Sequence, residues 1–189
     1  MQTSIGVRKL VEFTLKRGNL ISSVNSQNTA LDGINIHQQL QKKFSKDTKA
    51  EFSLKKELLI DGESWILHGR ADGLKCIDDI PSQIIEIKTS SLEFEELSAN
   101  TLELYWAQAK IYAHIIMEKE GLSELSLKLI YVQTTTNVTT EKIQVINKNK
   151  AKDFFNEVIE SFTNWIKLQH QLKKERDLSI NNLDFPFSS

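Results

Sequence analysis

The spacing of apolar residues along the chain predicts four helices. Apolar residues that recur every three or four positions form one side of a helix, and Val7, Leu10, Val11 and Leu15 follow this spacing. The predicted helices cover residues 4–16, 29–44, 93–119 and 151–174. In the last helix, the residues expected to point inward are Phe155, Val158, Ile159, Phe162, Trp165 and Ile166.

Runs of β-branched and aromatic residues predict strands over residues 52–60, 64–77, 83–89, 125–134 and 140–146. A turn is predicted at Asp78, Asp79, Pro81 and Ser82, and the Asn- and Ser-rich residues 18–28 predict a loop. The order of elements predicts an α/β fold with a mixed central sheet flanked by helices. Within it, the first three strands form an antiparallel meander, and 125–134 returns in parallel after a crossover helix.

The hairpin of the second and third strands combines two acids and a lysine. Glu86 and Lys88 lie two residues apart, so they share a face of their strand. Asp72 and Glu86 are both seven residues from Asp79, so a hairpin folded about Asp79 sets them opposite each other, with Cβ atoms roughly 5 Å apart. Carboxylates that close repel each other unless a cation lies between them or one of them takes a proton. Oxygen ligands of this kind suit Mg²⁺ or Mn²⁺.

Simpler interpretations of each motif stay open. Glu-x-Lys on a strand is commonly a solvated ion pair, but here the charges alternate with Ile84, Ile85 and Ile87, and charges beside apolar runs are costly unless paired or metal-bound. A histidine on the apolar side of a helix is either a packed residue or a ligand, and His37 is in this position. Gln108 and Tyr112 share one side of a helix and could be its polar edge.

Four ordered motifs resemble the PD-(D/E)XK nuclease superfamily, and its RecB-like branch in particular. They are Gly-Ile-Asn-Ile-His ending at His37, Gly-Arg-Ala-Asp ending at Asp72, Glu86-Ile-Lys88 and the Q-x-x-x-Y of residues 108–112. Together they span roughly residues 30 to 132. The resemblance implies a restriction-endonuclease-like core and a metal-dependent DNA nuclease that leaves 5′-phosphates.

The resemblance also implies a role for each residue. Asp72 and Glu86 bind the metal, Ile87 adds its backbone carbonyl, and His37 is a further ligand. Lys88 assists the attacking water, either as a general base or as an electrostatic clamp. Gln108 and Tyr112 support the site or contact DNA. The site is expected where the Asp72 and Glu86 strands diverge at the edge of the sheet.

Cysteine content excludes one cofactor of such nucleases. An iron–sulfur cluster of the kind found in some relatives needs four thiolates, and this chain has only Cys76. Cys76 is expected to be a small buried hydrophobic residue. One cysteine also argues against a disulfide-stapled secreted protein, and no apolar run is long enough for a membrane span. A cytoplasmic enzyme with no membrane partner is therefore expected.

The overall charge is close to neutral, with 24 Lys and Arg against 25 Asp and Glu, so it does not by itself indicate a nucleic-acid binder. Basic residues do cluster locally, and such clusters can follow phosphates. The clusters are Arg8, Lys9, Lys16 and Arg17, and then Lys42, Lys43, Lys46, Lys49, Lys55 and Lys56. Two alternatives to a nuclease are a catalytically inactive module that binds DNA or a partner protein, and a scaffold with an ordinary salt bridge.

The last residues suggest a larger context. A single nuclease domain is expected over residues 1–180, and 181–189 is expected to be a linker or the start of a following helicase domain. Its Phe185-Pro-Phe187 stretch after a polar linker resembles the lead-in to the motor of XPD/DinG-like helicases. The expected partners are therefore DNA and a helicase domain on a longer chain, in DNA repair or processing.

Overall fold

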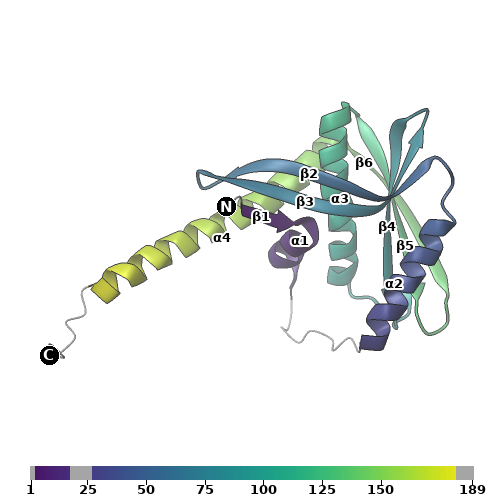
Figure 1. Ribbon diagram of the computed structural model, residues 1–189, viewed down its shortest axis with the longest axis horizontal. Helices are drawn as coiled ribbons and strands as arrows, with labels where there is room; N and C mark the ends of the chain where they lie inside the picture. Colours follow the sequence, from purple (N-terminus) through teal and green to yellow (C-terminus); the bar gives the residue numbers. More distant parts are fainter. Residues whose placement is uncertain (1–2, 18–26, 182–189) are drawn as a thin grey trace.

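A mixed sheet with helices on both faces forms the protein, as the order of elements predicted (Figure 1). The computed structural model describes residues 3–17 and 27–181. The elements are β1 (Thr3–Gly6), α1 (Val7–Leu15), α2 (Gln27–Lys42), β2 (Thr48–Ile60), β3 (Glu63–Ile77), β4 (Ile80–Ser90), the short 3-10 helix η1 (Phe94–Glu96), α3 (Ala99–Glu120), β5 (Glu124–Gln133), β6 (Thr139–Asn147) and α4 (Lys148–Asn181).

The strand order is β1-β3-β4-β5-β6, with β2 paired to β3. As predicted, β2, β3 and β4 form an antiparallel meander, and β5 pairs in parallel with β4 after the crossover helix α3. The sheet also contains a strand that was not predicted, because β1 pairs in parallel with residues 65–68 of β3. β2 already pairs along one side of β3, so β1 and β4 share its other side.

Two apolar clusters hold the helices on the sheet. The larger cluster joins one face of the sheet to α1, α3 and α4, and includes Leu10, Leu67, Ile84, Ile111 and Phe162. On the opposite face, α2 covers β4 and β5 through a smaller cluster of Ile85, Ile87, Ile130 and Val132 with Ile36, Leu40 and Phe44. Alternating residues of β4 therefore point to α3 and to α2. The part of the second face formed by β2 and β3 extends beyond α2 (Figure 1).

The β3–β4 hairpin has the predicted register, but its turn is shorter than predicted. The turn consists of Asp78 and Asp79, both left-handed at φ 49° and 64°, as in two-residue hairpin loops. Pro81 and Ser82 belong to β4 instead. Cys76 pairs with Pro81 and Lys75 pairs with Gln83, so Ser82 is the extra residue of a β-bulge. The Ser82 hydroxyl donates a hydrogen bond of 3.1 Å to the Lys75 carbonyl.

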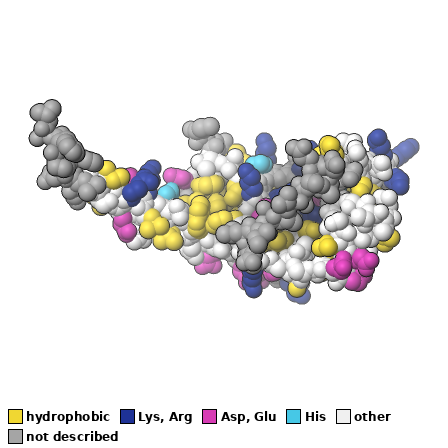
Figure 2. Space-filling model, turned by 90° about the horizontal axis from the view of Figure 1, so that it is seen from below, with side chains coloured by type: hydrophobic (Ala, Val, Ile, Leu, Met, Phe, Trp, Pro, Cys, Tyr) yellow, Lys and Arg dark blue, Asp and Glu magenta, His cyan; other side chains and the backbone are white. Residues whose placement is uncertain are grey.

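Two predictions about the ends of the chain are wrong in part. The predicted first helix begins only at Val7, because residues 3–6 gain a backbone partner in β3 that the local pattern does not reveal. Trp165 of α4 is 38% exposed although it was expected inward. Its ring packs 4.7 Å from that of Phe13. Hydrophobic side chains gather on the face of the molecule that Figure 2 shows.

The remaining predicted elements agree with the structure apart from their ends. β2 begins four residues earlier than predicted, at Thr48, and α4 continues to Asn181. Cys76 is buried, as predicted. Most of the predicted loop at 18–28 and the predicted linker beyond Asn181 lie outside the described residues. The helix α2 already begins at Gln27. Among the described residues, no helix is both long enough and apolar enough to cross a membrane.

Candidate active site

The candidate site lies at a gap inside the sheet. The pairing of β4 with β3 stops at the Gly73–Ile85 pair, and the pairing of β1 with β3 stops at His68. Residues 69–72 therefore have no strand beside them on this side. The prediction that the Asp72 and Glu86 strands diverge is confirmed. The predicted location at the edge of the sheet is wrong, because β2 pairs with the other side of β3 and β5 with the other side of β4.

All seven residues singled out in the sequence line one cavity of about 1700 Å³ at this gap. They are His37, Asp72, Glu86, Ile87, Lys88, Gln108 and Tyr112. Pockets for drug-sized ligands typically measure about 300–1,000 Å³. This cavity is therefore large enough for part of a polymer.

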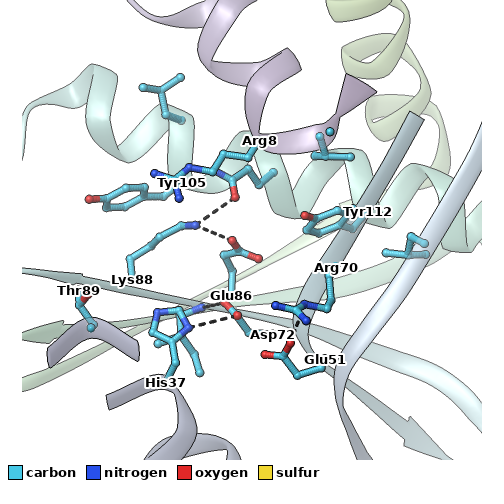
Figure 3. Close-up of a pocket in the computed structure, with 18 of the residues that line it drawn as sticks. Arg8, His37, Glu51, Arg70, Asp72, Glu86, Lys88, Thr89, Tyr105 and Tyr112 are labelled. Carbon is cyan, nitrogen blue, oxygen red and sulfur yellow. Dashed lines mark hydrogen bonds and ion pairs between the residues drawn. The ribbon is translucent and has the colours of Figure 1, made fainter. Parts of the chain in front are cut away.

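Glu86 and Lys88 face α3, on the same side of β4 (Figure 3). The Lys88 ammonium donates hydrogen bonds of 2.6 Å to Glu86 Oε1 and 3.0 Å to Gln108 Oε1. It also lies 5.7 Å from the centre of the Tyr105 ring. Gln108 is 6% exposed, so it is a buried acceptor for the lysine and not a solvated edge of the helix.

Asp72 makes its contacts on the side of α2. Its Oδ1 lies 3.3 Å from Nδ1 of His37, and its Oδ2 accepts a 2.7 Å hydrogen bond from the Ile87 backbone N–H. Gln41 of α2 donates to the Asp72 carbonyl. The two carboxylates thus meet in the gap from opposite sides of the sheet, whereas the sequence predicted them on one face. Asp72 and Glu86 do not form the predicted opposite pair, because the pairing of β3 with β4 ends at Gly73 and Ile85.

The Glu86 carboxyl group is in an unfavourable position for a charge. Burial raises its pKa above the ordinary value, the Lys88 ammonium lowers it, and the negative charge of Asp72 raises it. Its Oε2 atom is buried and has no hydrogen-bond partner among the described residues. A buried carboxylate oxygen without a partner is costly, so this atom is available for a ligand with positive charge.

The donor atoms around the gap fit a divalent cation. Two carboxylates and an imidazole are suitable ligands for Mg²⁺ or Mn²⁺, and Glu86 Oε2 is free to bind. A strand residue directs its N–H and C=O to the same side, so the Ile87 carbonyl faces Asp72 as its N–H does. Within residues 3–17 and 27–181, however, no three His, Cys, Asp or Glu side chains converge on one point. The fit therefore rests mainly on Asp72 and Glu86.

Tyr112 fills the gap from the side of α3. It is 3% exposed. A Cβ atom on Gly69 would lie only 2.6 Å from its Cε1 atom, so glycine is required for the ring to approach β3. Burial raises the pKa of the Tyr112 hydroxyl, the Glu86 charge raises it further, and a hydrogen bond from the Arg70 backbone lowers it. Tyr112 thus packs, from the side of α3, against the part of β3 that has no neighbouring strand at the gap.

Several residues of the cavity were not predicted as site residues. Tyr105 lies beside Lys88, and Arg8 of α1 lines the cavity with its Nε atom 2.8 Å from Glu12. The sequence does place Arg8 in a basic cluster, which was a usable signal. On the side of α2, Arg70 Nε lies 2.6 Å from Glu51 Oε2, a pair that forms only because β2 and β3 are neighbours.

Comparisons with known proteins give a likeness in structure only. The sequence matches no protein-family model and no curated protein. Among solved structures, the protein SSO0001 is similar over 85% of this chain and 77% of its own, with a TM-score of 0.52 and 21% identity. A phage-related exonuclease from Haemophilus somnus (TM-score 0.44, 14% identity, 90% and 82% covered) and an alkaline exonuclease from Laribacter hongkongensis (0.40, 10%, 93% and 94%) also match. The likeness to SSO0001 shows that the fold also occurs in a solved structure.

Proposed function

We propose that this chain is a metal-dependent deoxyribonuclease of the PD-(D/E)XK type. The observation that supports this proposal best is the meeting of Asp72, Glu86 and Lys88 in one large cavity, with Glu86 Oε2 buried and without a partner. The four motifs lie far apart along the sequence, from residue 33 to residue 112, and the fold brings all of them to the gap. Four unrelated surface motifs would not be expected to meet in this way.

Asp72 and Glu86 would hold the cation, with the Ile87 carbonyl and His37 as further ligands. A divalent cation there would lower the pKa of a bound water and offset negative charge on the phosphate. The protein supplies the negative charge that binds it: two carboxylates in a region where burial and mutual repulsion already disfavour ionised Glu86. The cost of that arrangement without a cation is the expected sign of a binding site.

Lys88 would act on the phosphate as a positive clamp. An ammonium group has three N–H donors, and two of them are held by Glu86 and Gln108. The third donor remains for a phosphate oxygen or for the attacking water. The water oxygen bonds to phosphorus and loses one proton to solvent, while the P–O3′ bond breaks and the leaving oxygen takes up a proton from solvent. Fixed positive charge near the developing negative charge lowers the barrier of this step.

Gln108 and Tyr112 would support the site and would not touch DNA. Both are buried, at 6% and 3% exposure, so nucleic acid cannot reach most of their surface. Gln108 orients the Lys88 ammonium through the 3.0 Å hydrogen bond. Tyr112 holds the backbone of Arg70, two residues before Asp72.

The RecB-like branch and the place in a helicase–nuclease stay predictions. The branch rests on His37 and the Q-x-x-x-Y motif. The helicase context rests on residues 181–189, nearly all outside the described part of the chain. DNA as the substrate follows from the resemblance, and the assay below tests it directly.

The proposed activity can be tested with end-labelled single- and double-stranded DNA in Mg²⁺, Mn²⁺ or EDTA. We expect cleavage that needs a divalent cation. Glu86→Gln and Lys88→Ala should each lower the rate by about 10²-fold or more, the usual cost of removing one group that stabilises a transition state. Lys128→Gln is a matched control, since Lys128 pairs with Glu141 on the neighbouring strand and does not line the cavity.

Two outcomes would contradict the proposal. One is wild-type cleavage rates in both Glu86→Gln and Lys88→Ala, which would show that the activity does not use this site. The other is folded wild-type protein that binds DNA but cleaves none of it with either metal, which would favour the binding-only module.

A further inference from the structure

The outward face of the β2–β3 hairpin forms a floor that leads away from the gap. Along β2, Leu54 is buried while Ser53 and Lys55 on either side of it are exposed; along β3, Leu67 is buried while His68 is exposed. Successive strand residues point to opposite faces. The exposed residues of the two strands therefore share one face, which is the one that α2 covers farther along the sheet.

Cross-strand pairing arranges these exposed residues in rungs. Ser53 is opposite Arg70, and Lys55 is opposite His68. On the other side of His68, its partner in β1 is Gly6, whose lack of a side chain leaves space above the sheet. All five residues line the same cavity as the candidate active site. Rungs two residues apart along a strand are separated by roughly 6.7 Å. The floor therefore leads from Asp72 to the rung of Arg70 and then to the rung of His68.

Positive charge is available at the second rung. Arg8 pairs with Glu12 and Arg70 pairs with Glu51. Lys55, by contrast, has no ion-pair partner within the described part of the chain, and neither does His68. An exposed lysine beside a histidine, neither of them held in an ion pair among the described residues, is suited to an anion.

We propose that the rung of Lys55 and His68 binds a backbone phosphate of the substrate strand, on one side of the phosphate that is cleaved. The proposal rests on the proposed nuclease function for the identity of the anion. The substrate strand would leave the gap over Arg70 and cross the rung above Gly6. This binding site defines a path for the strand within the cavity, and it selects polynucleotides over dinucleotides, because only a longer strand reaches from Asp72 to Lys55.

Catalytic access supports a single strand at this point. The side chains of Glu86 and Lys88 are 5% and 17% exposed, so the cleaved phosphate must enter the gap to reach them. A strand held in a duplex keeps its backbone on the outside of a wide cylinder, whereas a free strand can bend into the cavity. The exposed polar side chains of β2 and β3 continue from the gap, where they can follow the backbone of one strand of nucleic acid.

Binding can be measured separately from cleavage in the Lys88→Ala protein. A labelled single-stranded 12-mer is titrated by fluorescence anisotropy at several salt concentrations, with Lys55→Gln and His68→Gln added singly and together. Each lost phosphate contact should weaken binding about threefold to fivefold. The loss of the Lys55 charge should also make the slope of log affinity against log salt about 0.7 less steep. Lys49→Gln is the matched control, being an exposed lysine of β2 that does not line the cavity.

Cleavage gives a second readout in proteins with intact Lys88. The Lys55→Gln and His68→Gln variants should raise KM for the 12-mer and leave the cleavage of a dinucleotide unchanged. An unchanged salt slope in the double variant, or the same loss in Lys49→Gln, would overturn the rung as a phosphate site. If wild-type protein cleaves no DNA, the nuclease proposal fails, while the anisotropy titration still decides whether the rung binds the strand.

Discussion

Gly69→Ala tests whether Tyr112 fills the gap as the structure shows. A Cβ at this position would lie 2.6 Å from Tyr112 Cε1 and 3.0 Å from Val7 Cγ2. Contacts below 3.0 Å force the ring to move, and overpacking of this kind costs about 1–3 kcal/mol. Alanine also restricts the unfolded chain, which offsets about 0.4–1 kcal/mol. The free energy of unfolding should therefore fall by about 0.5–2 kcal/mol.

The Tyr112→Ala background separates this clash from other effects of the glycine. Without the ring, the closest contact disappears and only the Val7 contact remains. Gly69→Ala should then be neutral or stabilising by up to about 1 kcal/mol. The double-mutant cycle should give a coupling of about 1–3 kcal/mol between the two positions. Urea unfolding of the four proteins measures it. Equal costs of Gly69→Ala in both backgrounds would show that the ring does not occupy this space.

Three further predictions concern the site. Burial raises the Glu86 pKa in the folded state, so the wild type should lose stability relative to Glu86→Gln as pH rises through that pKa. The difference between their free energies of unfolding should fall by about 1.4 kcal/mol for each unit by which the folded-state pKa is raised. A difference that stays the same at all pH values, in urea titrations with chelator, would contradict this prediction. His37→Ala should weaken Mn²⁺ binding more than Mg²⁺ binding in calorimetry, because imidazole suits the softer ion, and unchanged Mn²⁺ affinity would leave His37 as a packing residue. Gln108→Ala and Tyr112→Phe should each lower turnover about 10–100-fold at normal melting temperature, and full activity would remove both from the site.

The sequence predicted the hairpin register for an incomplete reason. In a hairpin folded about Asp79, paired residues lie equally far from Asp79 along the chain. The Gly73–Ile85 pair has this spacing. The real turn is centred between Asp78 and Asp79, which alone would shift every pair by one residue. Ser82, bulged out of β4, restores the register. Composition cannot reveal a bulge of one serine, because its cause is a local hydrogen bond within the folded hairpin.

Other features of the site depend on contacts between distant segments. The periodicity of residues 4–16 predicts a helix correctly from Val7 onward, but it contains no sign that residues 3–6 pair with β3. That pairing ends the gap along β3 at His68. In the same way, the alternation of β4 places Glu86 and Lys88 together, whereas the meeting of His37 with Asp72 requires α2 on the opposite face.

The gap explains why two acids from antiparallel neighbours can face a common ligand without forming an ordinary cross-strand pair. A continuous sheet would commit the backbone of residues 69–72 to a neighbouring strand and cover Ile87. With β1 and β4 both ending their pairing here, the Ile87 N–H is free to bind Asp72 at 2.7 Å. Glu86 lies on the α3 side of the sheet, where one carboxylate oxygen accepts a hydrogen bond from Lys88 and the other has no partner among the described residues. Broken strand pairing thus leaves both an opening in the sheet and, inside it, a buried carboxylate oxygen without a hydrogen-bond partner among the described residues.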